Sequence, residues 1–252
     1  MTVYGVKVII GLNNKGLTGM TYILGSVCSD GVVLVSDRKV MLHYGAVHEF
    51  EDKLFKVTDW MIVGSSGISG LFEKFRAHLR AYMSSPNMEN TVPAIANEIE
   101  RITYGLNEKY RGVLAGQNFD VLLGIKSSTG AVLQYIYPIG FAEGVRKYKA
   151  IGHGEPYGSF FLKQWWQPNM TMLEVAGLGY FIIKYIQDFE LDNTVGIGNK
   201  QPQVWLIPKK PPPKGATPEQ IQLLNPYQLS NMDGMEDRVL QKIKEFKQLR
   251  WG

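Results

Sequence analysis

Three polar residues at equal intervals in the first quarter of the chain have the types that an activated threonine needs. Thr21 comes at the start of an expected strand, Asp37 at the end of the next strand, and Lys53 at the start of a third. The ends of antiparallel strands can converge, and a hydroxyl, a carboxylate and an amine together can make threonine a nucleophile. Spacing alone does not establish this chemistry, because an aspartate or a lysine at a strand end is usually solvated.

Metal and cofactor chemistry find little support in the sequence. Gly152-His153-Gly154 and Gly196-Ile197-Gly198 are short glycine pairs, and neither completes a dinucleotide or phosphate-loop pattern. The four histidines show no metal-binding spacing; they are His43, His48, His78 and His153. We therefore expect no metal ion and no cofactor.

Composition indicates a globular protein and limits its possible partners and cellular compartment. The 27 Lys and Arg exceed the 23 Asp and Glu by four and are scattered, so the charge pattern does not favour nucleic-acid binding. Cys28 is the single cysteine, which excludes an intramolecular disulfide and fits a reducing compartment. No apolar run approaches the roughly 18 residues of a membrane span, and the start lacks a signal-peptide pattern. We expect a cytoplasmic protein with no membrane partner.

The elements that must position these residues are strands and helices in alternating blocks. A hairpin is predicted over 22–36, because Ser29-Asp30-Gly31 separates two β-branched runs. The other predicted strands lie at 53–57, 60–64, 119–126, 131–137, 148–151 and 203–207. Helices are predicted where apolar residues recur every three or four positions, at 68–83, 92–106, 156–166 and 171–187. This order predicts an α+β fold, a four-layer αββα sandwich of two antiparallel sheets flanked by helices.

The composition changes after the last predicted strand. From Pro208 the sequence KKPPPKGATP is rich in proline, which predicts an extended tether. Beyond it, 235–251 has the spacing of an amphipathic helix. We therefore divide the chain into an N-terminal extension or propeptide at 1–20, a main domain at 21–207, and a tether with a helix at 208–252.

The stretch from Thr21 to Gly70 resembles the N-terminal half of proteasome subunits, more β-type than α-type, within the N-terminal-nucleophile hydrolases. The resemblance rests on the DGVVL turn and strand, the Asp37-Arg38 pair, the FEDKLFKV strand and the SSG turn before a helix. A weaker similarity continues through FDVLLGIK, the GHG turn and MTMLEVAG to about Ile207. About three quarters of the chain is covered, and the fold that the resemblance implies is the αββα sandwich.

The resemblance also implies roles for individual residues. Thr21 matches the catalytic threonine, Asp37 the carboxylate that orients the lysine, and Lys53 the lysine beside the nucleophile. Gly67 matches the glycine whose backbone N–H helps to form the oxyanion hole. The α-amine of a freed Thr21, with a reference pKa of about 7.7–8.0, would accept the hydroxyl proton, and Lys53 would favour the alkoxide.

The sequence departs from the family pattern at three places. His153 stands where the family has an activating serine, and residues 190–193 match the downstream Asp-x-x-Ser element only loosely. Met20, rather than the usual glycine, precedes Thr21. Residues 1–19 are therefore either a propeptide or a segment upstream of the true translation start at Met20, and in the second case removal of Met20 would expose Thr21. His153 is kept as a catalytic candidate that can hydrogen-bond near the amine.

The resemblance further implies a pocket for the side chain before the scissile bond. A small Ser65 would leave this pocket deep, and two carboxylates would favour a basic side chain. The positions that match the pocket are Val40, Glu51, Phe55, Ser65, Ser69 and Glu73.

Three functions agree with these observations. The first is a threonine endopeptidase in stacked rings of its own or paralogous subunits, which receives unfolded polypeptides through an ATPase unfoldase. The second is a non-catalytic ring subunit whose N-terminal extension blocks Thr21. The third is an N-terminal-nucleophile amidase or peptide ligase. The polar residues at the strand ends favour catalysis, whereas the altered serine element and the extension favour the second function.

Overall fold

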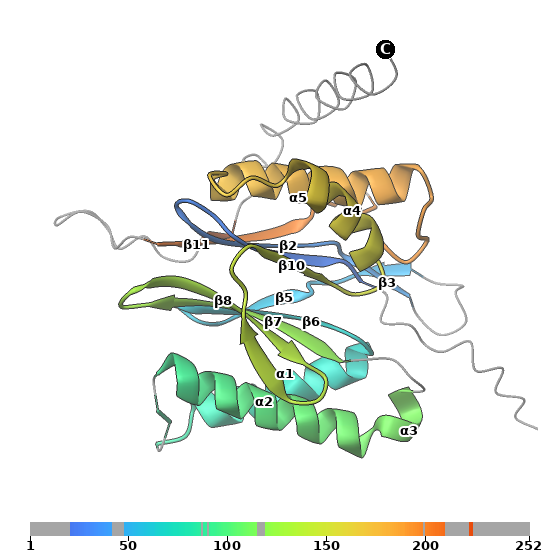
Figure 1. The fold of residues 1–252 in the computed structure, drawn as a ribbon. Coiled ribbons are helices and arrows are strands. Elements are labelled where there is room, and N and C mark those ends of the chain that lie inside the picture. Colours follow the sequence, from blue (N-terminus) through green and yellow to red (C-terminus); the bar gives the residue numbers. More distant parts are fainter. Residues whose placement is uncertain are drawn as a thin grey trace, which may run out of the picture.

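Two five-stranded antiparallel sheets lie face to face at the centre of the molecule (Figure 1). The computed structural model describes residues 21–41, 48–86, 88–89, 91–114, 119–198, 200–209 and 222–223. The first sheet has the order β10-β1-β2-β11-β12, formed by Tyr148–Ile151, Ile23–Val27, Gly31–Ser36, Gln203–Pro208 and Gln222–Leu223. The second has the order β5-β6-β7-β8-β9, formed by Leu54–Thr58, Met61–Ser66, Asp120–Ser127, Gly130–Tyr137 and Phe141–Gly144.

Helices cover the outer face of each sheet. Helices α4 (Glu155–Trp165) and α5 (Met172–Asp188) lie over the first sheet, and α1 (Ser69–Met83) and α2 (Val92–Lys109) lie over the second (Figure 1). A short α3 (Arg111–Leu114) follows α2. The predicted four-layer αββα sandwich is confirmed.

Strands β1 and β2 are buried along almost their whole length because they are covered on both sides. Their hairpin pairs Val27 with Val32 across the predicted Asp-Gly turn. Apolar side chains of both sheets meet in the middle layer, among them Ile23, Leu34, Ile62, Leu122, Leu133 and Ile207. The sheets approach closely, since a Cβ on Gly124 would lie 2.6 Å from Leu34. This packing fixes the strand ends at which the polar residues lie.

The helix starts follow local sequence signals. The Thr171 hydroxyl accepts a hydrogen bond from the N–H of Glu174, and the Glu174 carboxylate accepts one from the N–H of Thr171, which forms a capping box at the start of α5. Thr91 caps α2 in front of Pro93, which occupies a first-turn position. No helix within the described ranges is long and apolar enough to cross a bilayer.

Some elements were not predicted from the sequence. Strands β3 (Lys39–Met41) and β4 (His48–Phe50) form a small separate sheet, and β9 follows β8. Strand β12 pairs with β11 through Leu223 and Trp205, so part of the predicted tether segment extends the first sheet. The predicted extension at 1–20 and the predicted helix at 235–251 lie outside the described residues.

Candidate active site

The register of the first sheet brings Thr21 between two polar segments. Strand β1 lies between β10 and β2, and Ile23 is opposite Ile151 on one side and Ser36 on the other. Continued to Thr21, the same register sets this residue opposite His153 on the β10 side and opposite Arg38, the neighbour of Asp37, on the β2 side. The end of β1 is thus flanked by functional groups from both neighbours.

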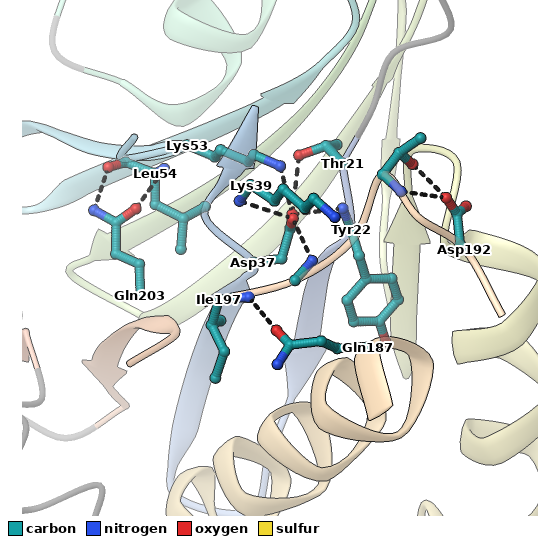
Figure 2. Close-up of polar contacts among 12 residues, drawn as sticks. Thr21, Tyr22, Asp37, Lys39, Lys53, Leu54, Gln187, Asp192, Ile197 and Gln203 are labelled. Atoms are coloured by element: carbon teal, nitrogen blue, oxygen red, sulfur yellow. Dashed lines mark hydrogen bonds and ion pairs between the residues drawn. The ribbon is translucent and has the colours of Figure 1, made fainter. Parts of the chain in front are cut away.

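Asp37 is the centre of the polar contacts on the β2 side (Figure 2). Its Oδ1 accepts hydrogen bonds from Thr21 Oγ1 at 3.2 Å and from Lys53 Nζ at 2.6 Å. Hydroxyl and ammonium therefore meet at one oxygen atom. The structure brings together the three residues whose spacing suggested an activated threonine.

Backbone groups hold the Asp37 carboxylate in place. Tyr22 N–H donates to Oδ1 at 2.8 Å, while the N–H groups of Lys39 and Gly196 each donate to Oδ2 at 3.2 Å. Because every one of these partners is a donor, the ionised carboxylate is the form that satisfies them. Asp37 is a fixed acceptor that orients Thr21 and Lys53.

The ion pair of Lys53 and Asp37 is excluded from water. The Lys53 side chain is 8% exposed and that of Asp37 is 0% exposed. Burial lowers the pKa of Lys53, and the Asp37 carboxylate opposes this change by attracting the ammonium. Burial acts to raise the pKa of Asp37, whereas Lys53 and the N–H groups of Tyr22 and Gly196 act to lower it. Because little water reaches this site, solvent only weakly screens the interaction between the charges of Lys53 and Asp37.

A polar residue of the last long strand fixes the start of β5. The side-chain Oε1 of Gln203 accepts from the N–H of Leu54 at 2.8 Å, and its Nε2 donates to the Leu54 carbonyl at 2.6 Å. Gln203 belongs to the first sheet and Leu54 to the second, so this pair joins the sheets beside Lys53 (Figure 2). Sequence reasoning missed Gln203, although a glutamine in an apolar strand was the available signal.

The β10 side of Thr21 carries a second buried carboxylate. His153 Nδ1 lies 2.5 Å from Asp192 Oδ2, and the other carboxylate oxygen accepts from the N–H of Thr194 at 2.8 Å and from its hydroxyl. Burial raises the pKa of Asp192, but the hydrogen bonds from Thr194 and His153 outweigh burial and bring it below its ordinary value. Asp192 was only part of a loosely matching segment in the sequence, and the structure brings it to His153.

Gly67 lies at the end of β6, on the same side of the molecule as Lys53. Leu54, the first residue of β5, is opposite Gly64 of the antiparallel β6. Lys53, just before β5, therefore lies near the last residues of β6, which ends at Ser66 immediately before Gly67. Gly67 has φ of 127°, which L side chains rarely adopt. Its role as an oxyanion donor stays a prediction.

The residues of the predicted specificity pocket come from β3, β5, β6, α1 and the segment before β5. Val40 is half-buried in β3, Glu51 is exposed just before Lys53, and Ser65 is buried in β6. Ser69 is the first residue of α1. The charge of Glu51 interacts with Lys53, which puts one of the two predicted carboxylates near the site.

The remaining two pocket candidates have other contacts. Phe55 is buried in the core between the second sheet and α1, with its ring 5.3 Å from that of Phe72. Glu73 accepts a hydrogen bond from Arg76 at 2.8 Å, and the Arg76 guanidinium lies over the Phe55 ring. Arg76 therefore offsets the negative charge of Glu73, and the preference for a basic side chain stays a prediction that depends on Glu51.

Comparisons with known proteins identify the family of this chain. The family model for "Proteasome subunit" matches residues 18–197. Proteasome subunit beta 1 of Pyrobaculum arsenaticum is 26% identical over 169 residues, 66% of this chain and 81% of the relative. Proteasome subunit beta of Ferroglobus placidus is 25% identical over 171 residues, 66% of this chain and 78% of the relative.

The fold is also similar to those of solved structures. The solved structure of Anbu (ancestral beta-subunit) from Yersinia bercovieri superposes with a TM-score of 0.67 at 18% identity, covering 89% of this chain and 97% of that one. An Anbu (Gly-1) mutant from Hyphomicrobium sp. strain MC1 gives a TM-score of 0.67 at 15% identity, covering 89% and 96%. With a family model that spans most of the chain and curated relatives that are β subunits, this protein belongs to the proteasome subunit family.

Proposed function

We propose that the chain is a threonine endopeptidase subunit of a proteasome-like particle, with Thr21 as its N-terminal nucleophile after residues 1–20 are removed. The observation that carries the proposal is the shared contact at Asp37, where one buried carboxylate oxygen holds both the Thr21 hydroxyl and the Lys53 ammonium. A purely structural subunit gains little from a buried ion pair, because desolvation offsets most of its attraction.

Acylation begins at the Thr21 hydroxyl. Oγ1 attacks the scissile carbonyl carbon while its proton passes to the free α-amine, and the nearby Lys53 charge stabilises the developing alkoxide. A backbone N–H at the end of β6, assigned to Gly67 by the resemblance, donates to the oxyanion. The α-ammonium then gives its proton to the leaving nitrogen, and an ester of Thr21 remains.

Deacylation uses the same groups with water as the nucleophile. The α-amine takes a proton from water, the hydroxide attacks the ester carbon, and Thr21 Oγ1 leaves with the proton. Asp37 stays ionised throughout because its backbone donors are fixed. The mechanism requires a free α-amine, whereas in the full chain the nitrogen of Thr21 forms an amide with Met20.

Membership of the family supports a ring assembly for this chain. Copies of this chain, or this chain with paralogous subunits, would form stacked rings in the cytoplasm that enclose Thr21. Unfolded polypeptides delivered by an ATPase unfoldase would be the substrates. The exposed Glu51 near Lys53 supports a preference for a basic residue before the scissile bond, and equal cleavage of basic and large apolar peptides would remove that preference.

The test compares peptide hydrolysis by the assembled wild-type protein with hydrolysis by Thr21→Ala and Lys53→Ala. Lys56→Ala is the matched control, because Lys56 lies three residues after Lys53, in β5, and forms an exposed ion pair with Asp59 at the same 2.6 Å. We expect no hydrolysis by Thr21→Ala or Lys53→Ala and wild-type rates from Lys56→Ala, with assembly unchanged. Full activity in Thr21→Ala would reject the proposal.

A non-catalytic ring subunit is the second candidate, favoured by His153 in place of the family serine and by Met20 before Thr21. It predicts an assembled particle in which residues 1–20 remain and no peptide is cleaved. An amidase or ligase would instead show Thr21-dependent activity on a small or specific substrate without general peptide hydrolysis. The same panel of variants distinguishes the three functions.

A further inference from the structure

We infer that His153 and Asp192 form a proton relay that serves the α-amine of Thr21, with Asp192 as a positioning residue. This inference rests on the proposed function and adds a second set of groups to it. The Asp37 side of Thr21 holds the hydroxyl, and the β10 side would serve the nitrogen.

The backbone of β1 shows which side the Thr21 nitrogen faces. Tyr22 N–H donates to Asp37, and Asp37 N–H donates to the Tyr22 carbonyl at 3.1 Å, so both backbone groups of Tyr22 point to the β2 side. Successive residues of a strand point these groups in opposite directions. The nitrogen and carbonyl of Thr21 therefore face β10, and Gly154 N–H donates to that carbonyl at 3.2 Å.

The glycines on both sides of His153 keep its loop close to Thr21. Gly152 has φ of 92°, and a Cβ there would lie 2.3 Å from the Thr21 carbonyl oxygen. Gly154 makes the hydrogen bond to the same oxygen. His153, between them, is held beside the edge of β1 to which the Thr21 nitrogen points.

Asp192 determines the protonation pattern of the imidazole. Its side chain is only 3% exposed, and its two oxygens are divided between His153 and Thr194. A carboxylate can only accept, so Nδ1 of His153 carries the proton of this hydrogen bond. Nε2 is then the acceptor of the neutral ring, and the side chain is 49% exposed, so water can reach it.

The relay moves one proton. Before attack, the α-ammonium of Thr21 gives a proton to Nε2 of His153, directly or through water, which breaks one N–H bond and forms another. Asp192 stabilises the resulting imidazolium, and the exposed ring releases the proton to solvent. Among the described residues, charged groups near the loop include Glu155, at the start of α4, and Lys53, whose charge interacts with Asp192.

The first experiment measures kcat and KM for peptide hydrolysis by the assembled protein whose chain begins at Thr21 and by its His153→Ala variant, with and without added imidazole. General acid–base groups contribute typically 10²–10⁴ in rate, and water can replace part of this relay, so we expect a loss of about 100-fold in kcat with KM unchanged. Soluble imidazole should restore activity because the side chain is half exposed. A merely structural histidine would give no rescue, and a wild-type rate without imidazole would overturn the relay.

Asp192→Asn tests the positioning role. An amide has one acceptor oxygen, so Asn at this position cannot accept from both Thr194 and His153, and its NH₂ would impose the other tautomer on the ring. We expect a loss of kcat similar to that of His153→Ala without rescue by imidazole. Asp188→Asn is the control, since Asp188 is an exposed partner of Lys184 at the end of the neighbouring helix.

A readout that does not need activity separates this inference from the proposed function. Mass spectrometry can follow deuterium exchange at the imidazole C2 position of each histidine in the assembled protein. Asp192→Asn should change the exchange rate of His153 severalfold and leave that of His78, on α1, unchanged. An unchanged His153 rate would overturn the relay even in an active enzyme, whereas absence of Thr21-dependent hydrolysis by the wild type would reject the proposed function.

Discussion

Replacing Lys53 with methionine removes the ammonium at the centre of the proposed site and keeps an unbranched side chain. Lys56, in β5, offers an internal comparison, because Lys53 and Lys56 each contact an aspartate at 2.6 Å. The Lys53 pair is 8% and 0% exposed, and the Lys56 pair is 32% and 77% exposed. The two substitutions therefore differ in burial far more than in chemistry.

The expected losses in the free energy of unfolding follow from this difference in burial. Removing one partner of a buried ion pair costs about 3–5 kcal/mol, and an exposed pair contributes about 0.2–1 kcal/mol. Asp37 would keep the N–H donors of Tyr22, Lys39 and Gly196, which places Lys53→Met at the lower end, about 3 kcal/mol. Lys56→Met should cost less than about 1 kcal/mol.

The cost of Lys53→Met should also depend on pH. Burial acts to raise the pKa of Asp37 and Lys53 opposes it, so without Lys53 the folded-state pKa lies further above the unfolded value. The folded variant then binds a proton more readily than the unfolded chain, and its destabilisation is largest at neutral pH and shrinks as the pH falls through the folded pKa.

Urea unfolding of the wild type, Lys53→Met and Lys56→Met at pH 7 and pH 5 measures these differences, with peptide hydrolysis assayed in parallel. The expected result is a large loss of stability and activity for Lys53→Met, smaller in stability at pH 5, and little change for Lys56→Met. Equal small losses in stability for both variants would refute the reasoning that burial makes the Asp37 contact special.

Three further predictions concern the surroundings of the site. Gly152→Ala should abolish most activity, because its φ of 92° and the 2.3 Å approach to the Thr21 carbonyl oxygen require Thr21 to move, while Gly144→Ala, with open space around it, should retain wild-type kinetics. Burial raises the pKa of Asp120 to about 6, so its ionisation costs the folded state about 2–3 kcal/mol as the pH rises through that value. Asp120→Asn should therefore raise the urea midpoint at pH 8 and leave it unchanged at pH 4, and the opposite order would contradict this sign. Thr171→Ala should lower stability by about 1 kcal/mol through loss of the α5 cap, with kcat unchanged, and a loss of activity beyond the loss of folded protein would show that α5 acts on the site.

The sequence predicted the elements with strong periodicity and missed the short ones. The β1–β2 hairpin and helices α1, α2, α4 and α5 follow from turn residues and apolar spacing. Strands β3, β4 and β9 have three or four residues each, which is too few for alternation to stand out. Their pairing depends on neighbours distant in sequence.

The residues of the candidate site were singled out by type and by their position at strand ends. The register of the first sheet brings Thr21 and Asp37 together, whereas Lys53 comes from the segment before β5 and meets them because the two sheets pack face to face. Asp192 and Gln203 were harder to find, because their roles depend on loops and strands more than 100 residues away from Thr21 and Leu54. Phe55, a predicted pocket position, packs in the core between the second sheet and its helices, which its residue type and position in the sequence did not reveal.

The central claim is that Thr21 is an N-terminal nucleophile, and the intact mass of the purified assembled protein after treatment with a peptide vinyl sulfone tests it most directly. This electrophile adds to a nucleophilic hydroxyl without a leaving group, and digestion locates the adduct. The account predicts a chain that begins at Thr21 and carries one probe on that residue, with no probe on Thr21→Ala. A chain that begins at Thr21 and stays unlabelled, or one labelled elsewhere, would contradict it.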